Sequence, residues 1–300
     1  MDLSALIDCA TSTSCLVNQT SSGLIIGMLL FLVASGLSLI FGVLGVINFA
    51  HGSFYMLGAY FALAAFRLTD SFAVAVLAGA LGVATFGMVF ERLIVSKVYG
   101  SNVLMQLLVC YAVVLILDDV VKIVWGAEYQ LMGLPDEFRM PPIFFAGGVI
   151  PPYYAFLVFA AAAVGLLLWI AIGRTLFGKK VRAAAQNPAM VSALGINTVT
   201  LYAAVFGLGS LLAGLAGAFA APIRSLTPGM GLSILIESFI VTVIGGMGSI
   251  VGALAGALLI GLTRSFGTIG FPLFVDGLMF TVMVLVLVAK PSGLFGREVR

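Results

Sequence analysis

The sequence contains little charge, few metal-binding residues and no basic residue near its start. Charged residues make up 9% of the chain, which has three cysteines and a single histidine, His51. No group of cysteine or carboxylate residues accompanies His51, so we expect no metal site. The segment Met1–Ser22 has no lysine or arginine and therefore lacks the basic start of a cleavable signal peptide. We expect it to remain in the mature chain.

The shortage of polar residues excludes a soluble globular protein. Hydrophobic residues make up 62% of the 300 residues, and the mean hydropathy is +1.22. Soluble domains are typically about 45–50% apolar and about 25% charged, so this chain has too little polar surface to cover itself in water. The net charge of +2 is small and locally clustered, so nucleic acid is not an expected partner. The sequence predicts an integral membrane protein whose solvent is the lipid bilayer.

Apolar runs long enough to cross a bilayer recur along the whole chain. A transmembrane helix needs roughly 20 mainly apolar residues, so the runs predict an all-α protein with about eight hydrophobic spans. They are Leu24–Leu44, Val46–Phe66, Phe72–Phe90, Val103–Val121, Tyr153–Ile172, Val199–Ala221, Leu232–Leu262 and Pro272–Ala289. We expect an extracytoplasmic N-terminal segment (1–21), a transmembrane domain (22–290) and a cytoplasmic C-terminal tail (291–300).

Basic residues between the runs orient them in the membrane. The segment 174–182 holds four basic residues and no acid, and short cytoplasmic loops retain positive charge. Counting runs backwards from this segment places the loop 125–152 and the N-terminus outside. Counting forwards as simple crossings would place the C-terminal tail outside as well, although Lys290, Arg297 and Arg300 make this end basic. One of the later runs must therefore bend back.

Two apolar runs are interrupted inside the membrane. The run Leu232–Leu262 contains Gly245–Ser249, and each glycine weakens a helix by about 1 kcal/mol relative to alanine, so we predict two half-helices that meet within the membrane. A weaker break lies at Asn48–Ser53. Broken helices persist only where protein or a polar cavity surrounds their backbone, and paired breaks indicate a transport site. The predicted translocation path comprises Asn48, His51, Ser53, Glu237, Gly245, Gly246 and Gly248.

Some of these residues have alternative roles that the sequence leaves open. Glu237 lies inside an apolar run, where an ionisable group usually faces a cavity or a partner. It either meets the ammonium group of a solute or pairs with a basic residue. His51 and Asn48 are expected to hydrogen-bond the interrupted backbone, with direct solute contact as the alternative.

Small residues and thiols allow two further structural expectations. Gly248, Gly252 and Gly256 are four apart, as on one helix face that a neighbouring helix approaches closely. Cys9 and Cys15 are either free thiols or, on an oxidising side of the membrane, a disulfide that closes a small loop.

The segment Gly173–Lys180 nearly matches a phosphate-binding loop. That motif requires serine or threonine after its lysine to hold magnesium, but Lys180 follows Lys179. The segment also follows a membrane run rather than a strand. We therefore exclude nucleotide binding by this chain, expect no cofactor in it, and assign any ATP to a partner.

Several segments together resemble the LivH-type permeases, the membrane subunits of branched-chain amino-acid ABC importers. The segments are Gly45–Gly52 (GVINFAHG), Tyr55–Tyr60 (YMLGAY), Arg182–Pro188 (RAAAQNP), Ser192–Asn197 (SALGIN), Ile244–Ser249 (IGGMGS) and Lys290–Gly296 (KPSGLFG). They occur in the order of the family, and the resemblance extends from about Ser22 to Gly296, essentially the whole chain.

The resemblance implies an ABC importer permease of the bacterial inner membrane, not an enzyme. Its implied partners are a second, LivM-like permease subunit, two cytoplasmic ATPase subunits that bind ATP and magnesium, and an extracytoplasmic solute-binding protein. Branched-chain amino acids are the implied cargo, although some relatives carry urea, short amides or aromatic acids. The implied ATPase-coupling residues are Arg182, Ala183, Ala184, Gln186, Asn187, Pro188, Leu194 and Gly195, within the segment 174–198.

The coupling role also has a physical basis. An alanine-rich amphipathic helix at Val181–Gln186, stopped by Pro188, can present a compact knob to a partner, and a mere connecting loop is the alternative. Bulky replacements of Ala184 or Gly195 are then expected to uncouple ATP hydrolysis from uptake. A self-sufficient secondary transporter would also use broken helices, but the chain has few intramembrane carboxylates. A membrane-embedded enzyme would need a paired nucleophile and base that the sequence lacks.

Overall fold

Helices make up most of the chain in the computed structural model, which describes residues 3–296. The helices are α1 (Leu3–Thr11), α2 (Thr13–Leu44), α3 (His51–Thr69), α4 (Phe72–Leu93), α5 (Val103–Trp125), α6 (Pro152–Arg174), α7 (Leu176–Gln186), α8 (Pro188–Ala193), α9 (Thr198–Ala220), α10 (Met230–Gly245), α11 (Ile250–Gly270) and α12 (Val275–Ala289). Polar residues at the ends of the apolar runs begin several of them. Ser71, Asn102 and Asn197 each accept a hydrogen bond from an amide in the first turn of α4, α5 and α9.

The predicted class, a multi-span all-α membrane protein, is confirmed. Among the described residues, six helices are long and apolar enough to cross a membrane: α2, α4, α6, α9, α11 and α12, with α4 and α12 counted together with adjoining 3₁₀ turns. The helices α3 and α5, of 19 and 23 residues, correspond to two further predicted runs. The first span starts earlier than predicted, because α2 begins at Thr13 rather than near Leu24.

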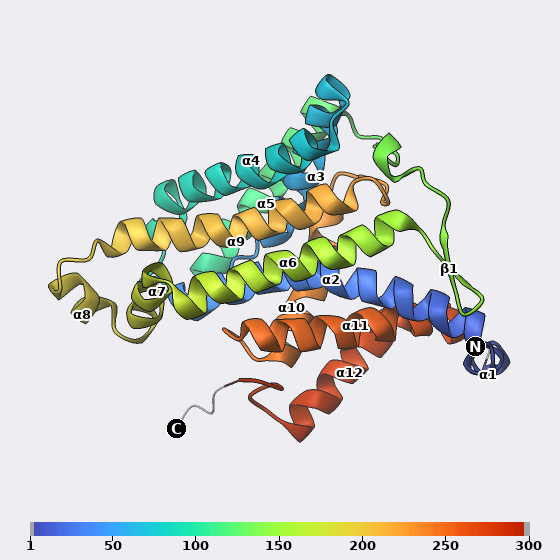
Figure 1. Cartoon of the computed structure of the whole chain (residues 1–300). Coiled ribbons are helices and arrows are strands. Elements are labelled where there is room, and N and C mark those ends of the chain that lie inside the picture. Colours follow the sequence, from blue (N-terminus) through green and yellow to red (C-terminus); the bar gives the residue numbers. More distant parts are fainter. Residues whose placement is uncertain (1–2, 297–300) are drawn as a thin grey trace.

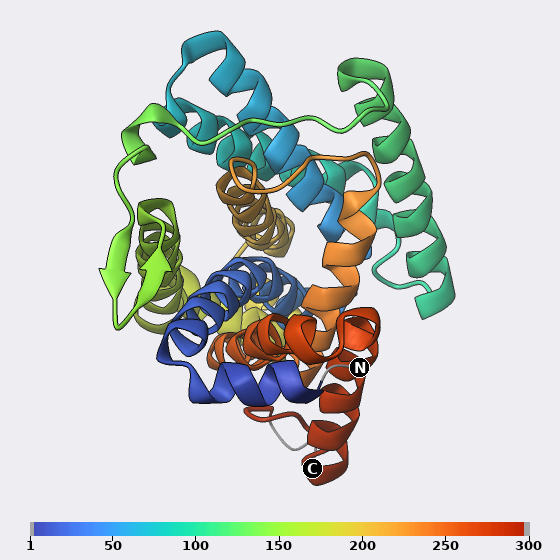
Figure 2. The ribbon, with the colours of Figure 1, turned by 90° about the vertical axis from the view of Figure 1, so that its right-hand side faces the viewer.

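The long helix α2 forms the centre of the bundle. It contacts α6, α9, α10 and α11, which surround it when the molecule is viewed along its length (Figure 2). Its buried residues from Ile25 to Ile40 lie on every side of the helix, as expected for a helix that is apolar all round. We call the end that carries α7 and α8 the α8 end, and the opposite end, which carries α1 and β1, the hairpin end (Figure 1).

The first predicted break is present, but the predicted span Val46–Phe66 starts too early. Gly45 ends α2 with a φ of +69°, and α3 begins only at His51. The His51 ring then reaches the carbonyl of Val33, which lies about 16 Å before the end of α2 at 1.5 Å per residue. The non-helical residues 45–50 therefore run back along α2 into the bundle, where protein buries them.

The second predicted break is also present, but it does not separate two half-helices. Helix α11 has 21 residues and is a full-length candidate span, whereas α10 has only 16. The turn between them lies against Gly42, near the C-terminal end of α2, so the break is at the α8 end rather than in the middle of the bundle. Gly248 belongs to this turn and not to the helix face that contains Gly252 and Gly256.

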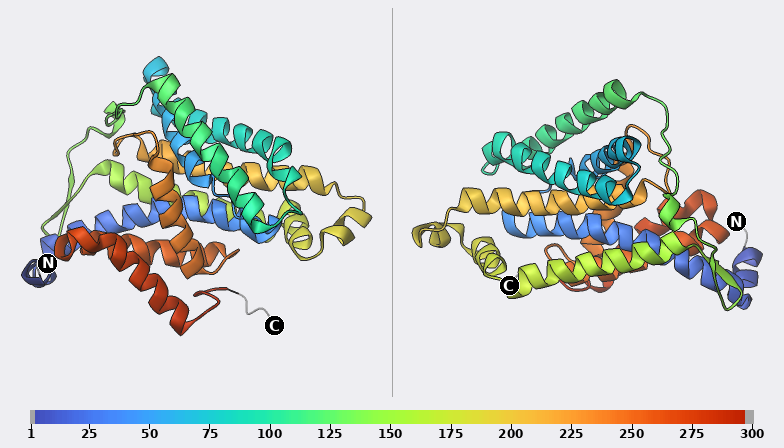
Figure 3. Two further views of the ribbon diagram at one scale, coloured as in Figure 1. Left: turned by 180° about the vertical axis from the view of Figure 1, so that it is seen from behind. Right: turned by 45° about the horizontal axis from the view of Figure 1, so that its top comes forward.

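Helix α10 resolves the topological conflict in the sequence. It crosses the bundle steeply inclined to α2 and α11 (Figure 3, left). The chain leaves α9 at the hairpin end, and α10 returns it to the start of α11 near Gly42. Helix α12 then runs back from the hairpin end. The run Leu232–Leu262 therefore bends back, as predicted, but as α10 followed by the full-length α11 and not as two half-helices. Of the basic residues that indicated the side of the tail, Arg297 and Arg300 lie outside the described residues.

The hairpin end is an ordered structure. Strands β1 (Ile143–Phe145) and β2 (Gly148–Ile150) pair antiparallel, and the Asn18 side chain accepts a 2.8 Å hydrogen bond from the Val149 amide. Cys9 and Cys15 form a disulfide, which decides between the two alternatives for these thiols. The disulfide ties α1 to the first turn of α2.

Candidate translocation site and docking end

The first group of predicted path residues lies at the start of α3. Asn48 Oδ1 accepts a 3.1 Å hydrogen bond from the Ala50 amide, and His51 Nε2 lies 3.1 Å from the carbonyl oxygen of Val33. The expectation that these residues hydrogen-bond the interrupted backbone is therefore confirmed for Asn48, whereas His51 bonds a carbonyl of the continuous helix α2. Asn48 Nδ2, His51 Nδ1 and Ser53 Oγ are buried, and the structure gives these three atoms no hydrogen-bond partner.

The second group of predicted path residues lies elsewhere. Gly245 and Gly246 are buried at the far end of α10, whereas the start of α3 meets the start of α10, where a Cβ on Gly52 would lie 2.0 Å from the Gly231 carbonyl oxygen. The 16 residues of α10 correspond to about 24 Å of helix. The two breaks therefore do not form one site, contrary to the sequence prediction.

The turn between α10 and α11 (residues 246–249), which we call the glycine turn, instead binds the C-terminal motif Lys290–Gly296. The amides of Leu294 and Phe295 donate hydrogen bonds of 2.8 and 3.0 Å to the carbonyl oxygens of Ile244 and Gly245. These carbonyls end α10 and would otherwise lack a helical partner. Two motifs that the sequence showed separately thus form one backbone-to-backbone contact.

Glu237 pairs with a basic residue of its own chain. Its Oε1 contacts Arg264 Nη1 of α11, and the two side chains are 9% and 29% exposed. A second arginine, Arg224, lies in the connection between α9 and α10 and lines a small cavity together with the buried Tyr55 of α3. The structure therefore favours the ion-pair alternative for Glu237 and adds Tyr55, Arg224 and Arg264 to its surroundings. We call these four residues the charged cluster.

The sequence analysis missed the basic members of the charged cluster, although a signal was present. The signal is their position: Arg224 and Arg264 are basic residues that follow the ends of two apolar runs. Their positive charge makes them candidate partners for a carboxylate. The pairing could not be assigned because the inclination of α10 decides which residue of α11 faces Glu237.

The predicted coupling residues lie at the α8 end, which projects beyond the other helices (Figure 1). The knob is longer than predicted, since α7 covers Leu176–Gln186 and Asn187 then begins α8 by accepting a 2.9 Å hydrogen bond from the Met190 amide. The coupling residues that are exposed are Arg182, Ala183, Gln186, Asn187, Pro188, Leu194 and Gly195. Ala184 is only 1% exposed, so it supports the packing of α7 rather than its outer face.

Local contacts fix the position of this end. Arg182 donates a hydrogen bond to the Ile172 carbonyl and so holds α7 against the end of α6. Tyr99 donates a hydrogen bond to Glu91 and packs edge-on against Tyr202 of α9. Burial and the bond to Glu91 raise the pKa of Tyr99 above its usual range, so its hydroxyl stays protonated and can donate.

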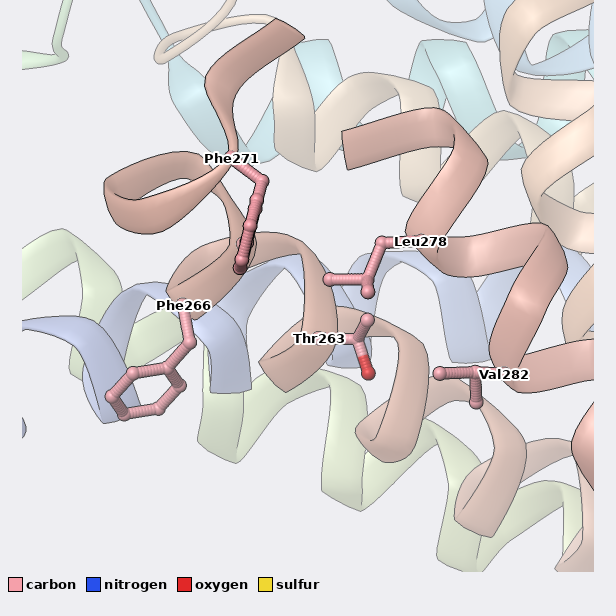
Figure 4. Close-up of a pocket in the computed structure, with 6 residues that line it drawn as sticks. Thr263, Phe266, Phe271, Leu278 and Val282 are labelled. Atoms are coloured by element: carbon pink, nitrogen blue, oxygen red, sulfur yellow. The ribbon is translucent and has the colours of Figure 1, made fainter. Parts of the chain in front are cut away.

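A cavity of about 290 Å³ lies between α11 and α12 (Figure 4). Its lining residues are Thr263, Phe266, Gly267, Phe271, Leu278 and Val282. The hydroxyl of Thr263 already donates to the Leu259 carbonyl. The lining side chains therefore offer apolar contacts but no unused hydrogen-bond donor to a polar solute.

Comparison with known proteins identifies the family. Residues 19–287 match the family described as the permease component of branched-chain amino acid transport systems. The chain belongs to this family. The permease is therefore a multi-pass transport subunit of the inner membrane and not an enzyme.

Individual relatives agree with this assignment, and one solved structure has a similar fold. BraD of Pseudomonas aeruginosa, a high-affinity branched-chain amino acid transport system permease protein, is 31% identical over 295 residues, which cover 94% of this chain and 96% of BraD. LivH of Escherichia coli K12, which has the same description, is 28% identical with the same coverage. The structure of PsaBC from Streptococcus pneumoniae in complex with Fab has a TM-score of 0.51 at 13% identity, covers 96% of this chain and 95% of that chain, and supports the fold alone.

Proposed function

We propose that the permease forms half of the pore of an ATP-driven importer for branched-chain amino acids. BraD and LivH are both described as parts of high-affinity branched-chain amino acid transport systems, and each aligns with nearly the whole chain. The other half of the pore is a second, LivM-like permease subunit. Two cytoplasmic ATPase subunits bind ATP and magnesium, and an extracytoplasmic solute-binding protein delivers the amino acid.

The observation that carries the ATPase coupling is the exposed surface of α7 and α8. Met190 and Leu194 are 59% and 72% exposed on this projecting segment. Exposed apolar side chains at the tip of an ordered, capped helix pair favour a protein partner. The basic residues of 174–182 favour a cytoplasmic location for this end, and in this proposal the ATPase subunits bind the coupling segment 174–198 there. The N-terminal segment 1–21 is then outside and the C-terminal tail 291–300 inside.

The packing of α7 provides a route from this surface to the membrane helices. Helix α7 contacts α2, α6 and α9, and α2 contacts α10. Ser38 of α2 also accepts a 3.0 Å hydrogen bond from the Gly248 amide in the glycine turn. Closure of the ATPase subunits therefore moves α7 and α8, and α2 transmits the movement to α10.

Co-purification and reconstituted uptake test this function. The permease is expected to purify in mild detergent with an ATPase and a second permease. In proteoliposomes that also contain the binding protein, the complex is expected to take up leucine only when ATP is present. Leucine uptake by the isolated chain under an ion gradient, without ATP, would show that the permease is a secondary transporter instead.

Variants of the exposed surface test the docking role. Met190→Asp together with Leu194→Asp places two carboxylates on α8 and its C-cap and is expected to reduce co-purification of the ATPase roughly tenfold. Leu68→Asp is the matched control, because Leu68 is 86% exposed at the opposite, hairpin end. Equal ATPase recovery with all three proteins would exclude this surface as the docking site.

A further inference from the structure

The charged cluster is built from four parts of the fold. Glu237 lies on α10, Arg264 on α11, Tyr55 on α3 and Arg224 in the connection that leads into α10. Tyr55 is 3% exposed and Glu237 6% exposed. Tyr55, Arg224 and Ile234 line one cavity, and Ile234 lies about one helical turn before Glu237 on α10. The four side chains thus lie close together where α10 meets α3 and α11.

The cluster has an excess of positive charge. Within residues 3–296, Arg224 and Arg264 interact with one shared carboxylate, Glu237. A charge inside a membrane protein is costly unless it is paired. Arg264 has its partner in direct contact, whereas Arg224 has the neutral hydroxyl of Tyr55. An anion beside Arg224 would therefore balance the cluster.

The same cluster offers an acceptor to a cation. Oε1 of Glu237 contacts Arg264, but Oε2 is buried and the structure gives it no hydrogen-bond partner. A carboxylate oxygen in this state accepts strongly from an ammonium group. The cluster thus presents a cationic donor in Arg224 and an anionic acceptor in Glu237.

Aliphatic side chains enclose the space next to Arg224. A cavity of about 10 Å³ is lined by Ile26, Leu29, Leu30, Val33, Tyr55, Arg224 and Ile234. Its aliphatic walls come from α2 on one side and α10 on the other. A charged pair of groups next to an aliphatic wall matches a small zwitterion with a branched apolar side chain.

We propose that Arg224, Tyr55 and Glu237 form an intramembrane site for aliphatic amino acids. Arg224 and Tyr55 donate to the carboxylate of the amino acid, Glu237 Oε2 accepts from its ammonium group, and α2 and Ile234 contact its side chain. This proposal rests on the proposed function, because an amino acid reaches the site only if the permease forms part of its pore.

The structure represents the closed form of this site. A cavity of about 10 Å³ has room for no more than one water molecule, so an amino acid enters only when α10 moves away from α2. Glycines with positive φ flank α10 at both ends, Gly229 at +84° and Gly246 at +95°. Such residues absorb backbone changes at a hinge, so α10 can turn as a unit and open the space beside Arg224.

Uptake by the complete transporter in proteoliposomes tests the site. Arg224→Gln removes the cation and is expected to lower leucine uptake about tenfold or more, the effect of losing one charge-assisted hydrogen bond. Arg224→Lys is expected to restore part of it, and ATP hydrolysis stimulated by the loaded binding protein should persist. Arg139→Gln is the matched control, because Arg139 is exposed and pairs with Asp136 of its own loop. Unchanged uptake by Arg224→Gln would overturn the proposal.

Ligand stabilisation of the purified complex, without the binding protein, gives a second readout. Millimolar leucine is expected to raise the melting temperature of the wild type, whereas 4-methylpentanoate, which lacks the ammonium group, and 3-methylbutylamine, which lacks the carboxylate, should have little effect. Glu237→Gln should abolish the response to leucine. Equal responses to all three compounds would overturn the zwitterion site. A wild-type complex that assembles but does not transport leucine would instead refute the proposed function.

Discussion

Gly293 provides a test of the contact between the C-terminal motif and the glycine turn. Its φ of +78° is left-handed, and alanine in that conformation costs roughly 1–2 kcal/mol. A Cβ at Gly293 would also lie 2.6 Å from the Gly246 nitrogen and 2.8 Å from the Val243 oxygen, so the motif must move. That movement breaks the amide hydrogen bonds of Leu294 and Phe295, each about 1 kcal/mol. We expect Gly293→Ala to weaken docking of the motif by about 3 kcal/mol.

Hydrogen exchange of the Leu294 and Phe295 amides measures this docking directly. A loss of about 3 kcal/mol corresponds to roughly 100-fold faster exchange of both amides. Gly277→Ala is the matched control, since a Cβ on Gly277 in α12 would meet no atom within 4 Å and alanine favours a helix. Exchange rates in Gly293→Ala within about threefold of the wild type would refute the reasoning, because the hydrogen bonds would then persist despite the clash.

Three further changes test other contacts. Glu237→Ala leaves Arg264 without its partner and is expected to cost about 3 kcal/mol of folding free energy, measured by denaturation, whereas methionine at both positions should be nearly neutral. Cys9→Ser removes a disulfide with a separation of six residues and should destabilise the segment joining α1 to α2 by about 2 kcal/mol, while mass spectrometry shows Cys15 as a free thiol. A Cβ at Gly217 would lie 2.0 Å from a backbone oxygen of α3, so Gly217→Ala should lower the melting temperature, unlike Gly173→Ala, whose Cβ meets nothing within 4 Å.

The sequence predicted the helices because their apolar runs and polar boundaries are local properties. It also predicted both interruptions, since glycine and polar residues inside an apolar run weaken a helix wherever they occur. It did not predict where α3 begins. That boundary depends on the carbonyl of Val33, which binds the ring of His51 and thereby fixes the first turn of α3 deep in the bundle.

The contacts of α10 could not be predicted because they depend on the inclination of this helix. Gly245 of α10 contacts Gly252 of α11, and Val241 contacts Gly256. If the two helices ran antiparallel and continued this pairing, Glu237 would lie opposite Ile260. Arg264 lies one helical turn further and reaches back with its long side chain. Likewise, the binding of the tail to the glycine turn joins segments that only the return of α12 brings together.

Helix α10 connects the candidate site to the opposite end of the bundle. Its first turn contacts α3 through Gly231, its middle carries Glu237, and its last carbonyls are held by the C-terminal motif. Helix α10 is more rigid than Gly229 and Gly246, the glycines that flank it. A displacement of either end of α10 therefore moves Glu237 as well. The hydrogen bonds of the C-terminal motif therefore oppose the same movement that opens the space beside Arg224. In the proposed mechanism this resistance is overcome in every transport cycle, and ATP-driven movement of α7, transmitted through α2 to the glycine turn, acts at the end where the resistance lies.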